Sequence, residues 1–261
     1  MKPKLLYGIS GAVLKNIAIF SMCIDHFAAI VLNGWLQVRN TSNFVYYTQG
    51  FWQEFLMSPT LNTVYYTMRC IGRLAFPIFA FLIVEGVFHT RKPFRYLGRL
   101  AIFALISDVP FDLAFRGTFY TTRYQNVLFT LLIGAVTIMC MEQLRKKSSL
   151  PILIKGMGLV GFLLMGSSLA ELWNTDYGMY GILTIVVIYF LRGKPILQGI
   201  AGASVLYSMT RIQIYSYPVV FLLERYNGNR GRQNQYFFYL FYPLHILVFY
   251  GILQGIMKYL L

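Results

Sequence analysis

Long apolar runs separated by short polar segments cover most of this 261-residue chain. The strongest run begins near Gly11 and ends near Trp35, and a comparable run closes the chain from about Phe237 to Leu260. The runs between them predict further helices at about 64–89, 96–115, 124–143, 152–172, 180–191, 195–209 and 212–223. Because roughly 20 apolar residues cross a hydrocarbon layer, the pattern predicts an all-α, polytopic transmembrane helix bundle of about nine or ten spans. We expect a single integral membrane domain over residues 1–261.

Two segments depart from this simple pattern of spans. The stretch FVYYTQGFWQEFLM at 44–57 is amphipathic and aromatic, so we expect it to lie in the membrane interface, where Trp and Tyr rings are enriched. Pro110 falls inside the third predicted helix. A proline removes a backbone donor and clashes with the preceding turn, so it is expected to kink or end that helix.

The composition agrees with a membrane bundle. Hydrophobic residues make up 57% of the chain and charged residues only 12%, with a net charge of +14. The positive charges lie in short loops between apolar runs, which is typical of cytoplasmic loops and argues against nucleic-acid binding. The three cysteines, Cys23, Cys70 and Cys140, form no C-x-x-C pair. They predict neither a disulfide framework nor a zinc site.

The basic residues also predict an orientation. They concentrate in alternate loops at Arg91, Lys92, Arg95 and Arg99; Arg145, Lys146 and Lys147; Arg192 and Lys194; and Arg225, Arg230 and Arg232. Loops rich in Lys and Arg stay in the cytoplasm. We therefore expect a multi-pass protein of the cytoplasmic (inner or plasma) membrane, with its N-terminus inside and lipid as a constant partner.

The first helix carries ionisable residues within its apolar run. Asp25 and His26 lie near its middle, and Lys15 lies eleven residues before the histidine. Eleven residues make about three turns, so Lys15 and His26 share one face, roughly 16 Å apart along the axis. Such groups are costly in hydrocarbon unless they face a cavity or a partner, so they predict a functional site. A carboxylate can raise the basicity of an imidazole, although neighbours on a helix point about 100° apart and Asp25 can instead orient another group.

His245 is a second histidine inside a predicted span, two residues after Pro243. It either faces His26 across the bundle or hydrogen bonds a carbonyl that the proline leaves unpaired, and the sequence does not decide between them. The three histidines lack the spacing of metal ligands, so we expect no metal site.

Arg91, Arg95 and Arg99 recur every four residues and would form one basic stripe on a helix. This stripe is either ordinary cytoplasmic charge in contact with anionic lipid or a grip for polyphosphate, to which guanidinium groups are well suited. Most acidic residues, including Glu85 and Asp108, are expected to neutralise arginines in structural ion pairs.

Five stretches resemble the TraX family. They are K-x-x-A-x-x-x-M-x-x-D-H at Lys15–His26, GRLAFPIFAFLIVEG at 72–86, QNVLFTLLIG at 125–134, YGILTI at 180–185 and FYPLHILVFYGI at 241–252. TraX proteins are similar in turn to the acyltransferase-3 membrane enzymes, which carry a basic residue, ten intervening residues and a His in the first helix. Those enzymes also share R-x-A-x-P-x-F, matched at 73–79, and Y-x-x-H, matched at 242–245.

The resemblance implies an integral membrane acetyltransferase. Acetyl-CoA would be the donor, and the acceptor would be an amine or hydroxyl of a pilin-like peptide N-terminus or a glycan. His26 would be catalytic with support from Asp25 or His245, and the CoA phosphates would be held by Lys15, Arg91, Arg95 and Arg99. Structural or channel-lining roles would fall to Arg73, Glu85, Asp108 and Asn126.

Two other classes stay open at the level of sequence. Intramembrane Asp, Glu and His also suit a proton-coupled transporter, although no repeated halves are visible. A structural subunit of a secretion or pilus complex would leave the shared face of Lys15 and His26 unexplained. Binding of CoA separates the enzyme from the transporter.

Overall fold

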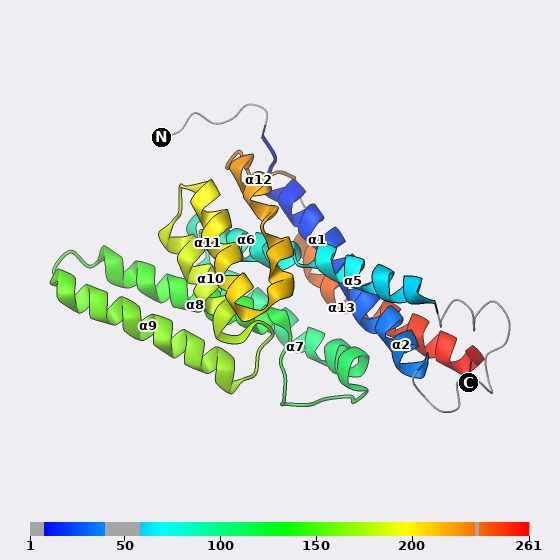
Figure 1. The fold of residues 1–261 in the computed structure, drawn as a ribbon. Coiled ribbons are helices and arrows are strands. Elements are labelled where there is room, and N and C mark those ends of the chain that lie inside the picture. The colour runs from blue at the N-terminus through cyan, green and yellow to red at the C-terminus, as the bar shows by residue number, and fades with distance from the viewer. Residues whose placement is uncertain (1–7, 40–57, 233–234, 261) are drawn as a thin grey trace.

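The computed structural model describes residues 8–39, 58–232 and 235–260, and every regular element in these ranges is a helix (Figure 1). The all-α prediction is confirmed. The predicted interfacial segment at 44–57 lies outside the described residues. In chain order the elements are α1 (Gly11–Phe27), the π-helix η1 (Ala28–Leu32), α2 (Asn33–Arg39), α5 (Pro59–Gly72), α6 (Ala75–His89), α7 (Pro93–Arg116), α8 (Val127–Lys146), α9 (Ile152–Leu172), α10 (Gly178–Phe190), α11 (Pro195–Met209), the 3-10 helix η2 (Arg211–Ser216), α12 (Val219–Glu224) and α13 (Gln235–Leu260).

Five helical stretches in the described residues are long and apolar enough to cross a membrane: Gly11–Gln37, Pro59–His89, Val127–Lys146, Ile152–Leu172 and Tyr236–Lys258. This indicates a multi-pass membrane protein, with fewer such stretches than the nine or ten spans expected. Three of the expected spans, α10, α11 and α12, have only 13, 15 and 6 residues. At 1.5 Å per residue such helices are shorter than a hydrocarbon layer of about 30 Å. A fourth, α7, is long enough with 24 residues, but it carries the charged residues Arg95, Arg99, Asp108, Asp112 and Arg116.

The predicted helix at 64–89 is divided into α5 and α6 by a turn at Arg73 and Leu74. Pro77 lies in the first turn of α6, and its missing N–H cannot bond the carbonyl of Arg73. The Arg73 and Leu74 amides bond the Cys70 and Ile71 carbonyls, three residues back. The Arg73 Nε then donates to the Arg69 carbonyl at 2.9 Å. The Arg73 side chain therefore gives a carbonyl near the break a hydrogen-bond donor, and the same bond fixes the position of the guanidinium group.

Two prolines have different effects on the helices predicted around them. Pro110 does not end α7, which continues to Arg116 and stops where Gly117 adopts a left-handed conformation with φ 66°. The span expected at 212–223 is not a single helix, because Pro218 separates η2 from the short α12. A proline starts a helix readily but cannot continue one without losing a hydrogen bond.

Helix α6 lies at the centre of the bundle and packs against α1, α8 and α10. The main core contains fully buried side chains from these helices, among them Leu14, Ile78, Ile138 and Ile182. On one side of this core, α1 and α2 run beside α13 with α5 next to them, whereas α8 and α9 form a hairpin on the other side (Figure 1). The two histidine-bearing helices, α1 and α13, are therefore neighbours.

Helix α9 covers the outside of the bundle. Only 6% of an 18-residue apolar segment of this helix is buried. Ile152 and Leu172, at the two ends of the helix, are 89% and 78% exposed. An apolar helix that shows its side chains outward in this way is suited to lipid contact.

Candidate active site

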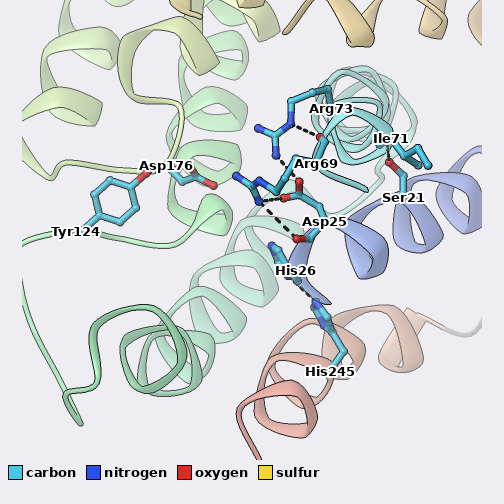
Figure 2. Close-up of polar contacts among 9 residues, drawn as sticks. All are labelled: Ser21, Asp25, His26, Arg69, Ile71, Arg73, Tyr124, Asp176 and His245. Atoms are coloured by element: carbon cyan, nitrogen blue, oxygen red, sulfur yellow. Dashed lines mark hydrogen bonds and ion pairs between the residues drawn. The ribbon is translucent and has the colours of Figure 1, made fainter. Parts of the chain in front are cut away.

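The centre of the site is a pair of histidines from helices far apart in the sequence. His26 on α1 and His245 on α13 lie with Nδ1 and Nε2 2.7 Å apart (Figure 2). Their rings are stacked, with centroids 4.9 Å apart and planes 2° from parallel. The π-helix η1 begins two residues after His26. Such π-segments are frequent at functional sites, where they rotate one part of a helix relative to the next.

The hydrogen bonds of this pair assign its protons. His245 Nδ1 lies 2.7 Å from the carbonyl of Phe241, and because a carbonyl only accepts, Nδ1 carries the proton. In a neutral ring His245 Nε2 is then an acceptor, so His26 Nδ1 donates to it. His26 Nε2 is left with its lone pair, which is the state required of a general base or a nucleophile. Of the two contacts that the sequence left open, His245 makes the one with His26. The Phe241 carbonyl that it also contacts is not the one that Pro243 leaves without a donor, which belongs to Tyr239, four residues before the proline.

Asp25 and the adjacent His26 contact different partners. Its carboxylate pairs with Arg69 at 2.8 Å and also with Arg73, and the Asp25 side chain is 13% exposed. In Figure 2 Asp25 points toward these guanidinium groups, whereas the His26 ring points toward His245. Asp25 therefore holds the break between α5 and α6 against α1, and its contacts orient arginines rather than His26.

The loop before α10 places another carboxylate near the same arginines. Asp176 accepts a hydrogen bond from the Tyr124 hydroxyl at 3.0 Å, and its side chain points toward the arginine pair in Figure 2. Burial raises the pKa of Asp176, while Tyr124 and Arg73 act in the opposite direction. Burial also raises the pKa of Tyr177 to about 12. The groups around Arg73 therefore form a buried polar cluster that includes two acidic side chains.

A cavity of about 500 Å³ leads toward the histidine pair. At one end it is lined by Lys15, Arg99 and Arg230, and deeper in it is lined by Met22 and Tyr242. Neither His26 nor His245 lines this cavity, but the lining residue Tyr242 has its ring centroid 6.0 Å from that of His26 and 5.7 Å from that of His245. The cavity therefore has a cationic end and an apolar inner wall against the histidines.

The structure brings together only part of the residue set expected to hold CoA. Lys15 and Arg99 line the cavity, whereas Arg91 and Arg95 are exposed and do not. A helix that starts at Pro93 cannot place Arg91 on the same stripe, because that residue precedes it. The sequence pattern predicts only a charged loop around Arg230. The tertiary fold places its side chain in the lining of the cavity.

The four residues expected to be structural or channel-lining also differ in whether they line the cavity. Glu85 lines the cavity and pairs with Arg192 at 2.9 Å, whereas Arg73 pairs with Asp25 outside the cavity lining. Asn126 caps α8 at the Leu128 amide, 3.0 Å away, and donates to the Asp108 carboxylate at 3.1 Å and to the Ala104 carbonyl at 2.9 Å. These bonds join α7 to α8.

Clustered polar side chains can also hold metal ions. Within the residues that the structure describes, no three His, Cys, Asp or Glu side chains gather as a group that could hold a metal ion. The polar clusters are instead arranged as ion pairs and hydrogen bonds.

Comparison with known proteins places the chain in a family. The family model of the TraX protein matches residues 10–253, which include every residue of the site described above. The chain is also 28% identical over 260 residues to a probable fimbrial assembly protein FimC, serogroup H1, from Dichelobacter nodosus. That alignment covers 89% of this chain and 91% of the relative. No solved structure matches the chain. The match extends over nearly the full length, and the chain belongs to the TraX family.

Proposed function

We propose that this protein is a membrane acetyltransferase that moves an acetyl group from cytoplasmic acetyl-CoA to an amine or hydroxyl acceptor. The TraX membership and the relative named as a fimbrial assembly protein favour an acceptor related to pilin assembly, such as a peptide N-terminus or a glycan. The observation that carries the proposal is the cavity, which connects three cationic side chains to the wall of the histidine pair.

The cationic end of the cavity suits the phosphates of CoA. Lys15 and Arg99 line it from α1 and α7, and guanidinium and ammonium groups are the usual phosphate partners in proteins. Lys15 and His26 lie eleven residues apart on one face, roughly 16 Å along the helix. The pantetheine arm of the donor would follow this face past Met22 and bring the thioester to Tyr242 and His26.

The chemistry rests on the lone pair of His26 Nε2. In the direct route this nitrogen removes a proton from the acceptor while the acceptor attacks the thioester carbonyl. The carbon–sulfur bond then breaks, and His26 returns the proton to the departing thiolate. In the two-step route Nε2 attacks the thioester carbonyl, and the carbon–sulfur bond breaks to release the CoA thiolate. The acceptor then attacks the acetyl group on His26, the carbon–nitrogen bond to Nε2 breaks, and the proton of the acceptor goes to the thiolate. His245 supports both routes because it keeps the proton of His26 on Nδ1.

The same geometry supports an orientation in the membrane. The cationic end of the cavity includes the start of α1 and the end of α6, where Gly11 and His89 line it. The basic loop after α10 meets this end through the Arg192–Glu85 pair. We therefore place this end of the bundle, and the N-terminus, on the cytoplasmic side of the inner membrane, where acetyl-CoA is available.

The test is binding and turnover of acetyl-CoA by the purified, detergent-solubilised full chain. Calorimetry measures binding, and release of free thiol measures slow turnover in the absence of an acceptor. We expect His26→Ala to keep binding and to lose thiol release by at least about 100-fold, the usual contribution of a general base. We expect Lys15→Ala to weaken binding about tenfold, which is the loss of one charge-assisted hydrogen bond.

A folded wild type that fails to bind acetyl-CoA would overturn the proposal and would favour the transporter, which has no need of CoA. Wild-type thiol release in the His26→Ala protein would instead overturn the role of the histidine. Phe20→Ala is a matched control on the same helix, because Phe20 is 69% exposed and lies outside the cavity lining.

A further inference from the structure

The loop between α12 and α13 is held against the start of α1 by a series of backbone hydrogen bonds. The Ile9 amide donates to the Arg225 carbonyl at 2.9 Å, and the Asn227 amide donates back to Ile9 at 3.0 Å. The Gly11 and Ala12 amides donate to the carbonyls of residues 229 and 230 at 2.8 and 2.9 Å. These contacts satisfy amides at the start of α1 that have no partner within the helix. Residues 225–231, which we call the docking loop, are therefore fixed on α1.

The close approach of the two segments depends on glycine. A Cβ on Gly8 would lie 2.6 Å from the Arg225 carbonyl oxygen, closer than real Cβ contacts. Gly228 and Gly231 adopt φ values of 75° and 73°, in the left-handed region that favours glycine. Because the docking loop is anchored on both sides of Gly228, its side chains take defined positions at the mouth of the cavity.

Three cations from three separate elements line the cavity: Lys15 from α1, Arg99 from α7 and Arg230 from the docking loop. Among the described residues that line the cavity, Glu85 carries the one carboxylate, and it pairs with Arg192 at 2.9 Å. The Arg99 Nε is buried and has no hydrogen-bond partner in the described part of the chain. A buried donor of this kind is costly to leave unpaired. The mouth therefore combines an excess of positive charge with a donor that lacks an acceptor. A polyanionic ligand would supply both the missing negative charge and the missing acceptor.

We infer that the docking loop forms the subsite for the phosphorylated nucleotide end of the donor and that Arg230 is its specificity-determining residue. The inference rests on the proposed acetyltransferase function and assigns the residues that distinguish a nucleotide-bearing donor from one without a nucleotide. A phosphopantetheine thioester on a carrier protein presents a single phosphodiester, whereas a free CoA thioester presents a diphosphate and a further phosphate monoester. Cations contributed by three elements match the second class.

The docking loop also suits the rest of the nucleotide. Tyr226 and Gly228 line the same cavity as Arg230, so the loop offers an aromatic ring and an uncovered stretch of backbone beside the cation. A guanidinium fork binds phosphate through two parallel hydrogen bonds. Arg230 lies in a loop rather than on a membrane helix, so substitution of its side chain leaves the backbone bonds to Ala12 in place.

The experiment compares CoA with 3′-dephospho-CoA and 4′-phosphopantetheine by calorimetry on the full chain in detergent. We expect wild type to bind CoA best, and Arg230→Gln to weaken CoA binding about tenfold. The loss for 4′-phosphopantetheine should be less than about twofold, so the preference of the protein for CoA shrinks. Arg230→Lys should recover part of the affinity, because it keeps the charge without the fork. Raising the salt concentration should weaken CoA binding to wild type more than to Arg230→Gln.

Arg232→Gln is the matched control, since Arg232 is exposed directly after the docking loop and does not line the cavity. It should bind CoA as wild type does. If Arg230→Gln also binds all three ligands with wild-type affinities, the inference is overturned while the proposed function stands. If wild type binds none of them, both are overturned. A thermal melt of each variant establishes that a loss of binding is not a loss of fold.

Discussion

Asp25 allows the most direct test of the site, because its expected effect on stability does not depend on any substrate. The perturbation is Asp25→Ala. Its carboxylate accepts from Arg69 at 2.8 Å and from Arg73, and the three side chains are 13%, 25% and 10% exposed in that order. Removal of the carboxylate leaves two guanidinium groups close together and largely out of solvent, with no negative charge between them.

The magnitude follows from the charges. Two unit charges about 4 Å apart attract by about 4 kcal/mol at an effective dielectric constant of about 20. Part of this gain is offset by the desolvation of the ions, but loss of one partner from a buried pair leaves that desolvation uncompensated and costs about 3–5 kcal/mol. For a chain of this size, about 1 kcal/mol corresponds to a shift of roughly 2–4 °C in Tm. We therefore expect Asp25→Ala to lower the Tm by roughly 10 °C.

The assay is thermal unfolding in detergent, followed by intrinsic fluorescence. Asp25→Asn keeps the shape and an acceptor oxygen, so its loss should be smaller than that of the alanine variant. Glu224→Ala removes an exposed carboxylate at the end of α12 and should change stability by less than about 0.5 kcal/mol. If the Asp25→Ala protein has the same Tm as the Glu224→Ala control, the ion pairs add nothing to stability and the reasoning above is refuted.

Two further predictions concern helix packing and capping. Gly166→Ala should destabilise the α8–α9 hairpin by about 1–3 kcal/mol, because the added Cβ would lie 2.3 Å from the Thr137 hydroxyl. Gly161→Ala on the same helix meets nothing within 4 Å and should be neutral or slightly stabilising in the same melts. Asn126→Ala should cost about 2–4 kcal/mol from the lost cap and the lost bonds to α7. Asn126→Ser keeps a capping oxygen and should recover about 1 kcal/mol, and equal melts for the two variants would contradict this account.

The helical class and the key helix of the site are readable from local sequence. The apolar runs predict a bundle of helices, since burial and hydrogen-bonding requirements in lipid act on each run separately. The placement of Lys15 and His26 on one face likewise needs only the helical period. The TraX motifs along the chain agree with the family match over residues 10–253.

Helix boundaries were less predictable where prolines lie near the middle of an apolar run. Pro77 accompanies a break between α5 and α6, whereas Pro110 lies within the continuous α7. The residue type is the same in both places. Near the break the Arg73 side chain bonds the Arg69 carbonyl and pairs with Asp25 of α1, and such contacts depend on the surroundings of a proline rather than on the proline itself.

The sequence by itself therefore determined the helical membrane architecture, the family and the shared face of Lys15 and His26, because each follows from local periodicity or from motifs in order. Only the tertiary structure decided the partners. It placed His245 against His26, paired Asp25 with two arginines instead of the adjacent histidine, and brought Arg230 to the cavity while Arg91 stayed outside. These contacts join residues up to 219 positions apart. Their formation depends on which helix faces meet when the bundle packs, and a periodic pattern on one helix contains no information about the face opposite it.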